Sequence, residues 1–353
     1  MSCNTGTHLC ADSPSSTSPP PPLPVPHLPR SVDRPIPLPL PTVRLPLPSS
    51  GVCVATLPAG YQPPKPPVGY RERGAAWARW QEDRERALAD LDPVVITDQV
   101  AHVRWGEGSR QGGVAALMVP YHECSRDLQQ AIGDCLEEVA GALQQDEGLL
   151  QRHWATYRGP DKVGRRGVLS LHFGLAGYNA NAPLWGESAR WISRHPSVLR
   201  VLARLARLVG QCLQGRLPDQ YLVFPRVAHV LGGGESRYPS GVINLTRTRP
   251  HTDPQDDPNS LACIVYLHPG GLGVPGAELK VTKAGVAFVA SSQVEHYGLD
   301  PEPAFGAGQA VLRVTFFLHA IRKASTSHSV PSPLADCFAP PSVPLSAADQ
   351  GMP

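Results

Sequence analysis

A histidine and an aspartate two residues apart are the most chemically suggestive feature of the sequence. His251 and Asp253 follow an alternating apolar run at 241–246, and a second histidine, His296, comes later in the chain. Side chains at positions i and i+2 of a strand point to the same side, so His251 and Asp253 can bind one metal ion together. Two histidines and one carboxylate on one face leave coordination positions open, which suits Fe(II) that also binds a cosubstrate and dioxygen.

An isolated His-x-Asp sequence arises often by chance, and two further features make the metal interpretation stronger. His296 follows a separate predicted strand at 286–290, so the three ligands are expected to assemble across a sheet. Arg313 lies in the apolar run 311–317, where an unpaired charge would be costly to bury. A carboxylate-bearing cosubstrate would pair Arg313, and the alternative is an ion pair with an internal acid such as Glu278.

The remaining sequence predicts a β-rich α+β fold, with a jelly-roll core backed by helices. Short β-rich runs separated by Pro, Gly, Asn or Asp clusters indicate a sandwich or barrel. The predicted strands are 94–97, 114–119, 221–224, 227–231, 242–246, 261–267, 277–281, 286–290 and 311–318. Helices are predicted at 77–91, at 126–145 with Ser125 as the N-cap, and from Pro196 onward. There is no phosphate-binding loop, which argues against nucleotide-driven chemistry.

The composition divides the 353 residues into three parts. Residues 1–70 are rich in the chain's 40 prolines, which predicts a disordered low-complexity tail. The globular domain is expected at 75–325, followed by a flexible tail at 326–353. Removal of residues 1–70 is therefore expected to leave the domain folded.

Cysteines and apolar runs bear on the compartment. The eight cysteines are scattered without close pairs, which indicates reduced thiols of an intracellular protein. No apolar run approaches the roughly 20 residues that a membrane helix needs. The chain also begins without the charged and apolar regions of a signal peptide. We therefore expect neither secretion nor a membrane.

Charge is distributed unevenly along the chain. Residues 151–250 carry 15 Lys and Arg against 4 Asp and Glu, whereas residues 81–150 carry 5 against 14. Arginine is suited to phosphate contacts and to stacking on bases, so one interpretation of the basic region is a nucleic-acid surface. In that interpretation, Tyr178 or Trp185 of the same region would stack on a base or fill the space behind it. The alternative is a solvated surface, and His229, His268 and His319 are interpreted as structural or surface residues.

The arrangement His251-x-Asp253-x-x-Asp256 resembles the double-stranded β-helix Fe(II) dioxygenases. Within them it resembles the TET/JBP group, which oxidises methylated bases in nucleic acid, and in particular the green-algal ascorbate-dependent 5-methylcytosine-modifying enzymes. The resemblance covers residues 115–325. It implies that Asp256 helps to hold ascorbate, which replaces 2-oxoglutarate and transfers a glyceryl unit to the methyl group. Asp256 is alternatively a turn residue.

These observations predict a nuclear, monomeric Fe(II) dioxygenase that modifies 5-methylcytosine in DNA. His251, Asp253 and His296 are the expected metal ligands and catalytic residues, and Asp256 and Arg313 are the expected cosubstrate-binding residues. The cosubstrate is ascorbate, with glyceryl transfer, or 2-oxoglutarate, with hydroxylation. Two alternatives stay open, namely a dioxygenase of a protein or small molecule and a catalytically inactive paralogue that binds DNA.

Overall fold

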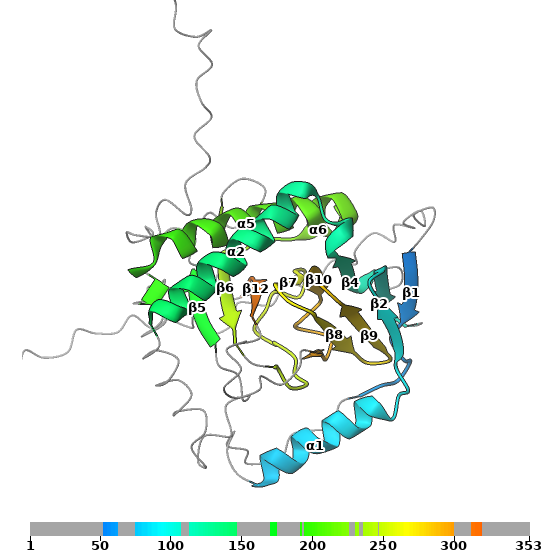
Figure 1. Ribbon diagram of the computed structural model, residues 1–353. Helices are drawn as coiled ribbons and strands as arrows, with labels where there is room; N and C mark the ends of the chain where they lie inside the picture. Colours follow the sequence, from blue (N-terminus) through cyan, green and yellow to red (C-terminus); the bar gives the residue numbers. More distant parts are fainter. Residues whose placement is uncertain are drawn as a thin grey trace, which may run out of the picture. The chain divides into compact units, whose positions relative to one another are not determined.

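Two β-sheets and several helices make up the described part of the chain (Figure 1). The larger sheet has eight strands and the smaller sheet has four. In this computed structural model the described residues are 52–62, 75–106, 113–146, 170–174, 191–192, 194–225, 230–232, 236–245, 247–299 and 312–319.

The larger sheet contains the most deeply buried strands. In spatial order its members are β1 (Val52–Thr56), β3 (Val100–Arg104), β4 (Val114–Pro120), β10 (Gly285–Val289), β7 (Ala262–Tyr266), β12 (Arg313–Phe317), β6 (Ser240–Asn244) and β5 (Ser170–Gly174). Strand β10 runs antiparallel to both β4 and β7. Every residue of these three strands is buried, as expected for strands that are covered on both faces.

The smaller sheet carries the strands that lie next to the predicted metal ligands. In spatial order it consists of β11 (Tyr297–Gly298), β8 (Gly270–Val274), β9 (Ala277–Val281) and β2 (Val94–Thr97). The ring of Tyr297 lies against the backbone of Gly273, where any side chain would collide with it. Gly273 therefore allows the close approach of β11, which begins immediately after His296.

The chain passes back and forth between the two sheets. After β6 in the larger sheet, the segment 247–251 runs beside the end of β11, where Gly298 N–H donates to the Thr248 carbonyl over 2.9 Å. Strand β7 returns to the larger sheet, β8 and β9 belong to the smaller one, and β10, β11 and β12 alternate again. This alternation is that of a double-stranded β-helix, and the predicted jelly-roll core is confirmed.

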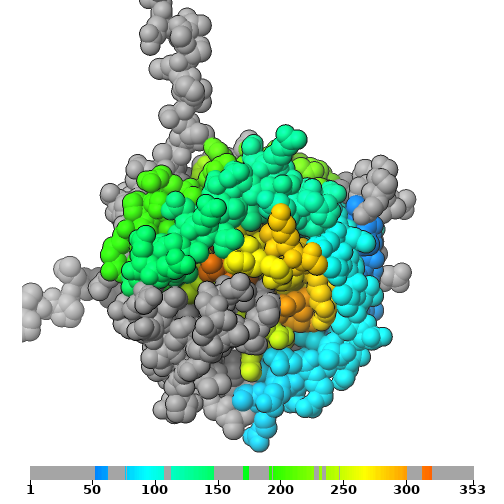
Figure 2. All heavy atoms as spheres, viewed as in Figure 1, coloured from blue at the N-terminus to red at the C-terminus, as the bar shows by residue number. Residues whose placement is uncertain are grey.

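A helical layer lies against the larger sheet. Helices α2 (Arg126–Gln145) and α5 (Pro196–Arg216) pack side by side (Figure 1). The predicted N-cap is present, because Ser125 Oγ accepts a hydrogen bond from Leu128 N–H over 3.3 Å. Figure 2 shows that this green layer leaves yellow and orange atoms of the later, strand-rich segment at the surface on the same face. None of the helices in the described ranges combines the length and the apolarity needed to cross a bilayer.

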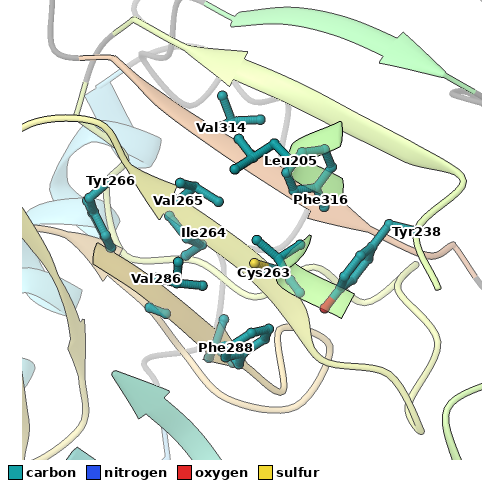
Figure 3. Packing of buried hydrophobic residues seen from close by; sticks show 14 of the residues in the cluster. Leu205, Tyr238, Cys263, Ile264, Val265, Tyr266, Val286, Phe288, Val314 and Phe316 are labelled. Carbon is teal, nitrogen blue, oxygen red and sulfur yellow. The ribbon is translucent and has the colours of Figure 1, made fainter. Parts of the chain in front are cut away.

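The hydrophobic core joins the helical layer to the larger sheet. Leu205 of α5 belongs to the same buried cluster as Val314 and Phe316 of β12 (Figure 3). The cluster continues through Val265 of β7 to Phe288 of β10, and all five side chains are fully buried. This packing fixes the strands whose connections carry the candidate site.

One predicted strand is a helix in the structure. Residues 221–224 were expected to be extended, but they belong to α6 (Pro218–Val223) and to its end at Phe224. Pro218 stands at the first helical position, where its missing N–H and its fixed φ are tolerated. A run of four apolar residues does not distinguish a strand from one helical turn, and Pro218 is the signal in the sequence that favours the helix. Part of the predicted strand 227–231 lies outside the described residues.

The predicted N-terminal tail extends too far toward the domain. Val52–Thr56 forms β1, which pairs in parallel with β3 at one edge of the larger sheet. The pairing continues to Leu57, whose N–H donates to the Arg104 carbonyl over 2.9 Å. Residues 49–57 lack proline, so all their backbone donors are available to a sheet. Residues 1–51 and the predicted tail at 326–353 lie outside the described residues.

Truncation of the N-terminal region tests this boundary. Removing residues 1–62 deletes β1 and its hydrogen bonds to β3, and we expect the unfolding temperature to fall by roughly 4–8 °C, as a loss of about 2 kcal/mol produces in a domain of this size. A matched truncation that removes only residues 1–50 retains β1 and should melt within about 2 °C of the full chain. Thermal unfolding followed by circular dichroism checks both variants. Equal melting of the two truncations would show that β1 does not contribute to stability.

Candidate metal centre

The three predicted metal ligands lie together in the structure. The ligand atoms of His251, Asp253 and His296 are all within 4.8 Å of one another. Asp253 Oδ2 is 3.4 Å from Nε2 of His251 and 3.7 Å from Nε2 of His296. Within the described ranges, this is the one group of three His, Cys, Asp or Glu side chains that comes so close. The expected convergence is found, and metal binding by this cluster is a proposal.

Backbone pairing brings the two histidines to one face. His251 N–H donates to the His296 carbonyl over 3.0 Å, and His296 N–H donates to the His251 carbonyl over 2.9 Å. Residues that exchange both hydrogen bonds in an antiparallel pair direct their side chains to the same side. The imidazole centroids are accordingly 4.3 Å apart. This pair is an isolated bridge, so His251 lies outside the regular strands, whereas the spacing argument assumed that His251 and Asp253 lie on a strand.

Two prolines shape the segment that carries His251 and Asp253. Arg249 and Asp253 each precede a proline, and the residue before a proline is biased toward extended conformations. Asp253 N–H donates to the Ser291 carbonyl over 2.8 Å, which ties this segment to the chain just after β10. A turn then begins at Asp253, with Pro254 at its second position and a 2.9 Å hydrogen bond from Asp256 N–H to the Asp253 carbonyl.

Hydrogen bonds to the backbone define which imidazole nitrogen faces the cluster. Nδ1 of His251 is 2.9 Å from the Arg249 carbonyl, and Nδ1 of His296 is 3.0 Å from the Val294 carbonyl. A carbonyl oxygen only accepts hydrogen bonds, so each Nδ1 carries the proton and each Nε2 presents a lone pair. This is the arrangement by which metal-binding histidines are oriented in proteins.

The donor set fits a divalent transition metal. Two Nε2 lone pairs and a carboxylate oxygen face one another, and a cation between them would remove their mutual repulsion. Nitrogen and oxygen donors in the ratio of two histidines to one carboxylate are typical of non-haem Fe(II) sites. The Asp253 side chain is 28% exposed, against 15% for His251 and 6% for His296, so the accessible side of the cluster is the side of Asp253.

Asp256 is a turn residue whose side chain is buried beside the cluster. Ser291 Oγ donates to its Oδ2 over 2.5 Å, and His319 Nδ1 lies 3.1 Å from its Oδ1. Burial raises the pKa of Asp256, and the Asp253 carboxylate raises it further, while the contacts with His319 and Ser291 act in the opposite direction. The backbone of Asp256 closes a turn, as the alternative interpretation expected. Its side chain is buried rather than exposed to solvent, so it also contributes to the surroundings of the cluster.

Arg313 is buried on β12 as predicted. It donates a hydrogen bond to Thr248 Oγ1, in the segment that leads to His251. Burial lowers the pKa of Arg313 to about 10, with Arg247 also lowering it and Tyr266 opposing, so the guanidinium remains charged at neutral pH. The alternative pairing with Glu278 finds no support, because the Glu278 carboxylate lies 2.8 Å from Lys280 Nζ.

The uneven charge is partly neutralised within the protein. Three arginines from the basic region contact acids from the acidic region: Arg194 with Asp146 at 3.0 Å, Arg204 with Asp134 at 2.5 Å and Arg216 with Glu123 at 3.2 Å. These pairs join α5 and its flanks to α2 and its flanks. Exposed pairs of this kind contribute about 0–1 kcal/mol each. The three arginines therefore take part in the contact between the α2 and α5 regions.

Other residues named from the sequence fall into two groups. Tyr178, Trp185 and His229 lie outside the described residues, so the stacking roles stay predictions. His268 is half-buried, and burial lowers its pKa. His319 was interpreted as structural or surface, but its position beside Asp256 places it next to the site. No local pattern marks His319, since its contact depends on how β12 ends against the turn at 253–256.

The fold and the cluster define a double-stranded β-helix protein with a facing set of two histidines and one aspartate. No protein-family model matches the sequence, and no curated protein is significantly similar to it. Among solved structures, the chain is similar to NgTET1 in complex with 5mC DNA, with a TM-score of 0.34 and 13% identity over 66% of this chain and 84% of that chain. A likeness of this degree carries no conclusion about activity, and the fold class rests on the sheet topology.

Loss of one imidazole tests the metal centre. In His251→Ala, two ligands remain, and we expect the affinity for Fe(II) to fall by at least about 100-fold because the chelate is incomplete. Anaerobic calorimetric titration with Fe(II) measures the affinity and the stoichiometry. His268→Ala is the matched control and should bind Fe(II) like the wild-type protein. Unchanged affinity in His251→Ala would refute the assignment of this ligand.

Proposed function

We propose that the protein is an Fe(II)-dependent dioxygenase that modifies 5-methylcytosine in DNA. The observation that carries the proposal is the convergence of His251 Nε2, His296 Nε2 and Asp253 Oδ2 on one point. The sequence resemblance of His251-x-Asp253-x-x-Asp256 to the TET/JBP group supports the choice of substrate. A nuclear location would follow from that substrate.

In this proposal, His251, Asp253 and His296 hold Fe(II) from one side. When bound, Fe(II) would supply the binding and activation of dioxygen together with an oxidisable cosubstrate. The two Nδ1–H groups are held by the Arg249 and Val294 carbonyls, so the imidazoles are oriented before any metal arrives. Their low exposure leaves the neighbourhood of Asp253 as the side from which a cosubstrate would enter.

Two buried charged residues are the proposed cosubstrate contacts. Arg313 and the Thr248 hydroxyl beside it would suit a carboxylate, which 2-oxoglutarate carries. Asp256, held between Ser291 and His319, would suit the hydroxyl groups of ascorbate. Ascorbate would lead to glyceryl transfer to the methyl group, and 2-oxoglutarate would lead to hydroxylation.

DNA binding would use arginines close to the cluster. Arg247 and Arg249 lie in the segment that leads into His251. The Arg249 side chain is 43% exposed and makes only a long contact of 3.9 Å with the exposed Glu85, while Arg247 Nε donates to the Gly298 carbonyl over 3.0 Å. Arginine contacts to phosphates would position the duplex without reading its sequence. The methylated cytosine would have to leave the base stack, because its methyl group cannot otherwise approach a buried metal.

A second candidate keeps the same centre and changes the substrate to a protein side chain or a small molecule. The ion pairs of Arg194, Arg204 and Arg216 favour this alternative, because they remove part of the basic surface that DNA would need. Dependence on salt separates the two candidates. Binding to DNA weakens steeply as salt increases, whereas a small substrate does not release phosphate counterions.

Incubation of the protein with methylated DNA tests the proposed function. Fe(II) is supplied with ascorbate or with 2-oxoglutarate, and the nucleosides are then analysed by mass spectrometry. We expect loss of 5-methylcytosine and gain of a glycerylated or a hydroxylated base with one of the two cosubstrates. His251→Ala should give less than about 1% of the wild-type product. A wild-type protein that binds Fe(II) but modifies no DNA would favour the second candidate.

The same assay tests Asp256. Asp256→Asn keeps the size of the side chain and removes its charge, and we expect turnover with ascorbate to fall by at least about tenfold. Asp257→Asn is the matched control, because Asp257 is equally buried and its Oδ1 accepts a hydrogen bond from Asn259 N–H over 2.9 Å. If both variants turn over at the same rate, Asp256 is a turn residue alone.

A further inference from the structure

A buried ion pair involves the residue that immediately precedes the proposed ligand His296. Arg84 of α1 (Ala75–Ala89) donates through Nε to Glu295 Oε1 over 2.5 Å, and its second nitrogen contacts the same oxygen. The hydroxyl of Tyr61 donates to the other carboxylate oxygen, Oε2. The side chains of Arg84 and Glu295 are 6% and 1% exposed. Three distant parts of the chain therefore meet at one carboxylate.

Glu295 is adjacent in sequence to the ligand His296. Glu295 immediately precedes the bridge between His251 and His296, so its carboxylate is attached to the same stretch of backbone as the His296 imidazole. The backbone between them also carries the Val294 carbonyl that accepts from Nδ1 of His296. Any displacement of Glu295 would therefore move both the imidazole and the group that orients it.

Packing alone does not hold this side of the backbone. A cavity of about 210 Å³ borders Tyr61, Thr252, Val294 and Glu295, and it also contacts Trp105. Thr252 lies between the ligands His251 and Asp253, so the cavity lies behind both ligand-bearing segments. The charged hydrogen bonds from Arg84 and Tyr61 hold the Glu295 carboxylate at the wall of this cavity.

A purely stabilising role is a weak explanation for this arrangement. Removing two charges from water costs much of what their attraction returns, so a buried ion pair is poor evidence of a net gain in stability. Arg84 is additionally held by the ring of Trp80, whose centroid is 4.7 Å from the guanidinium carbon. Burial raises the pKa of Tyr61 well above its ordinary value, and Glu295 raises it further, so the hydroxyl stays protonated and donates.

We propose that Tyr61 and Arg84 act through Glu295 as positioning residues for His296. The segment after β1 and helix α1 thereby set the affinity of the metal centre, although neither contributes a ligand. The inference rests on the proposed function, because it concerns the same centre. Tyr61 lies within residues 1–70, which the sequence assigned to a tail. The inference gives this residue a role at the site.

Binding of Co(II) is the test, with Tyr61→Phe as the main variant. Phenylalanine fills the space of tyrosine and removes only the hydroxyl that donates to Glu295. We expect about tenfold weaker Co(II) binding by calorimetry and a changed visible absorption spectrum of the bound Co(II), because the ligand geometry relaxes. Glu295→Gln removes the negative charge to which both Tyr61 and Arg84 donate, and it should weaken Co(II) binding by up to about 100-fold. Tyr238→Phe is the matched control, since its buried hydroxyl donates to the Leu261 carbonyl over 3.1 Å.

The outcomes separate this inference from the proposed function. A structural role alone would lower the unfolding temperature of Tyr61→Phe and Tyr238→Phe alike and leave both with wild-type Co(II) affinity and spectrum. That result, in a protein whose binding is abolished by His251→Ala, would overturn the positioning role and leave the metal centre intact. A wild-type protein that binds no Co(II) and no Fe(II) would overturn both.

Discussion

Two reciprocal backbone hydrogen bonds between His251 and His296 are the constraint on which the site depends. They join the segment that follows β6 to the segment that follows β10. Strands β6 and β10 belong to the larger sheet, whereas the joined segments lie beside β11 of the smaller sheet. Because the pairing is antiparallel and in register, it fixes two imidazoles on one face. A slip by one residue would place the two imidazoles on opposite faces and separate the ligands. The jelly roll therefore determines the ligand set through its register.

Charged groups surround the centre in a region that is otherwise apolar. Asp256 is buried in the turn that follows Asp253, and Arg313 is buried on β12. Glu295, which precedes His296, is buried together with Arg84. The larger sheet next to them is packed with aliphatic and aromatic side chains (Figure 3). Polar groups at this depth need partners, and each of the four has at least one. Among the described residues, the buried acidic and arginine side chains are thus concentrated around the candidate site.

The sequence predicts the ligand cluster because the required information is local. His251 and Asp253 are two residues apart, and the apolar alternation around 286–290 places His296 after a separate strand. Patterns of a few residues also predict the cap at Ser125 and the strands β2, β4, β6, β7, β9, β10 and β12. They do not predict β1, β3, β5, β8 and β11, which are short or rich in glycine or lie in stretches of mixed polarity. Residues 221–224 were predicted wrongly, since one apolar turn of a helix and a short strand share the same composition.

Contacts between distant segments could not be predicted in this way. Tyr61 lies in a stretch that composition assigns to a proline-rich tail, and Arg84 is one of several charged residues on an amphipathic helix. Their common partner, Glu295, is known only from the folded chain. His319 reaches Asp256 for the same reason, because β12 ends beside the turn at 253–256. Each of these contacts depends on tertiary register, which one sequence does not reveal.

X-ray absorption at the iron edge of the Fe(II)-loaded protein measures the proposed ligand set most directly. We expect nitrogen and oxygen neighbours only, with the outer-shell scattering of two imidazoles, at one iron per chain. Scattering from sulfur, or the absence of imidazole scattering, would contradict a centre formed by His251, Asp253 and His296.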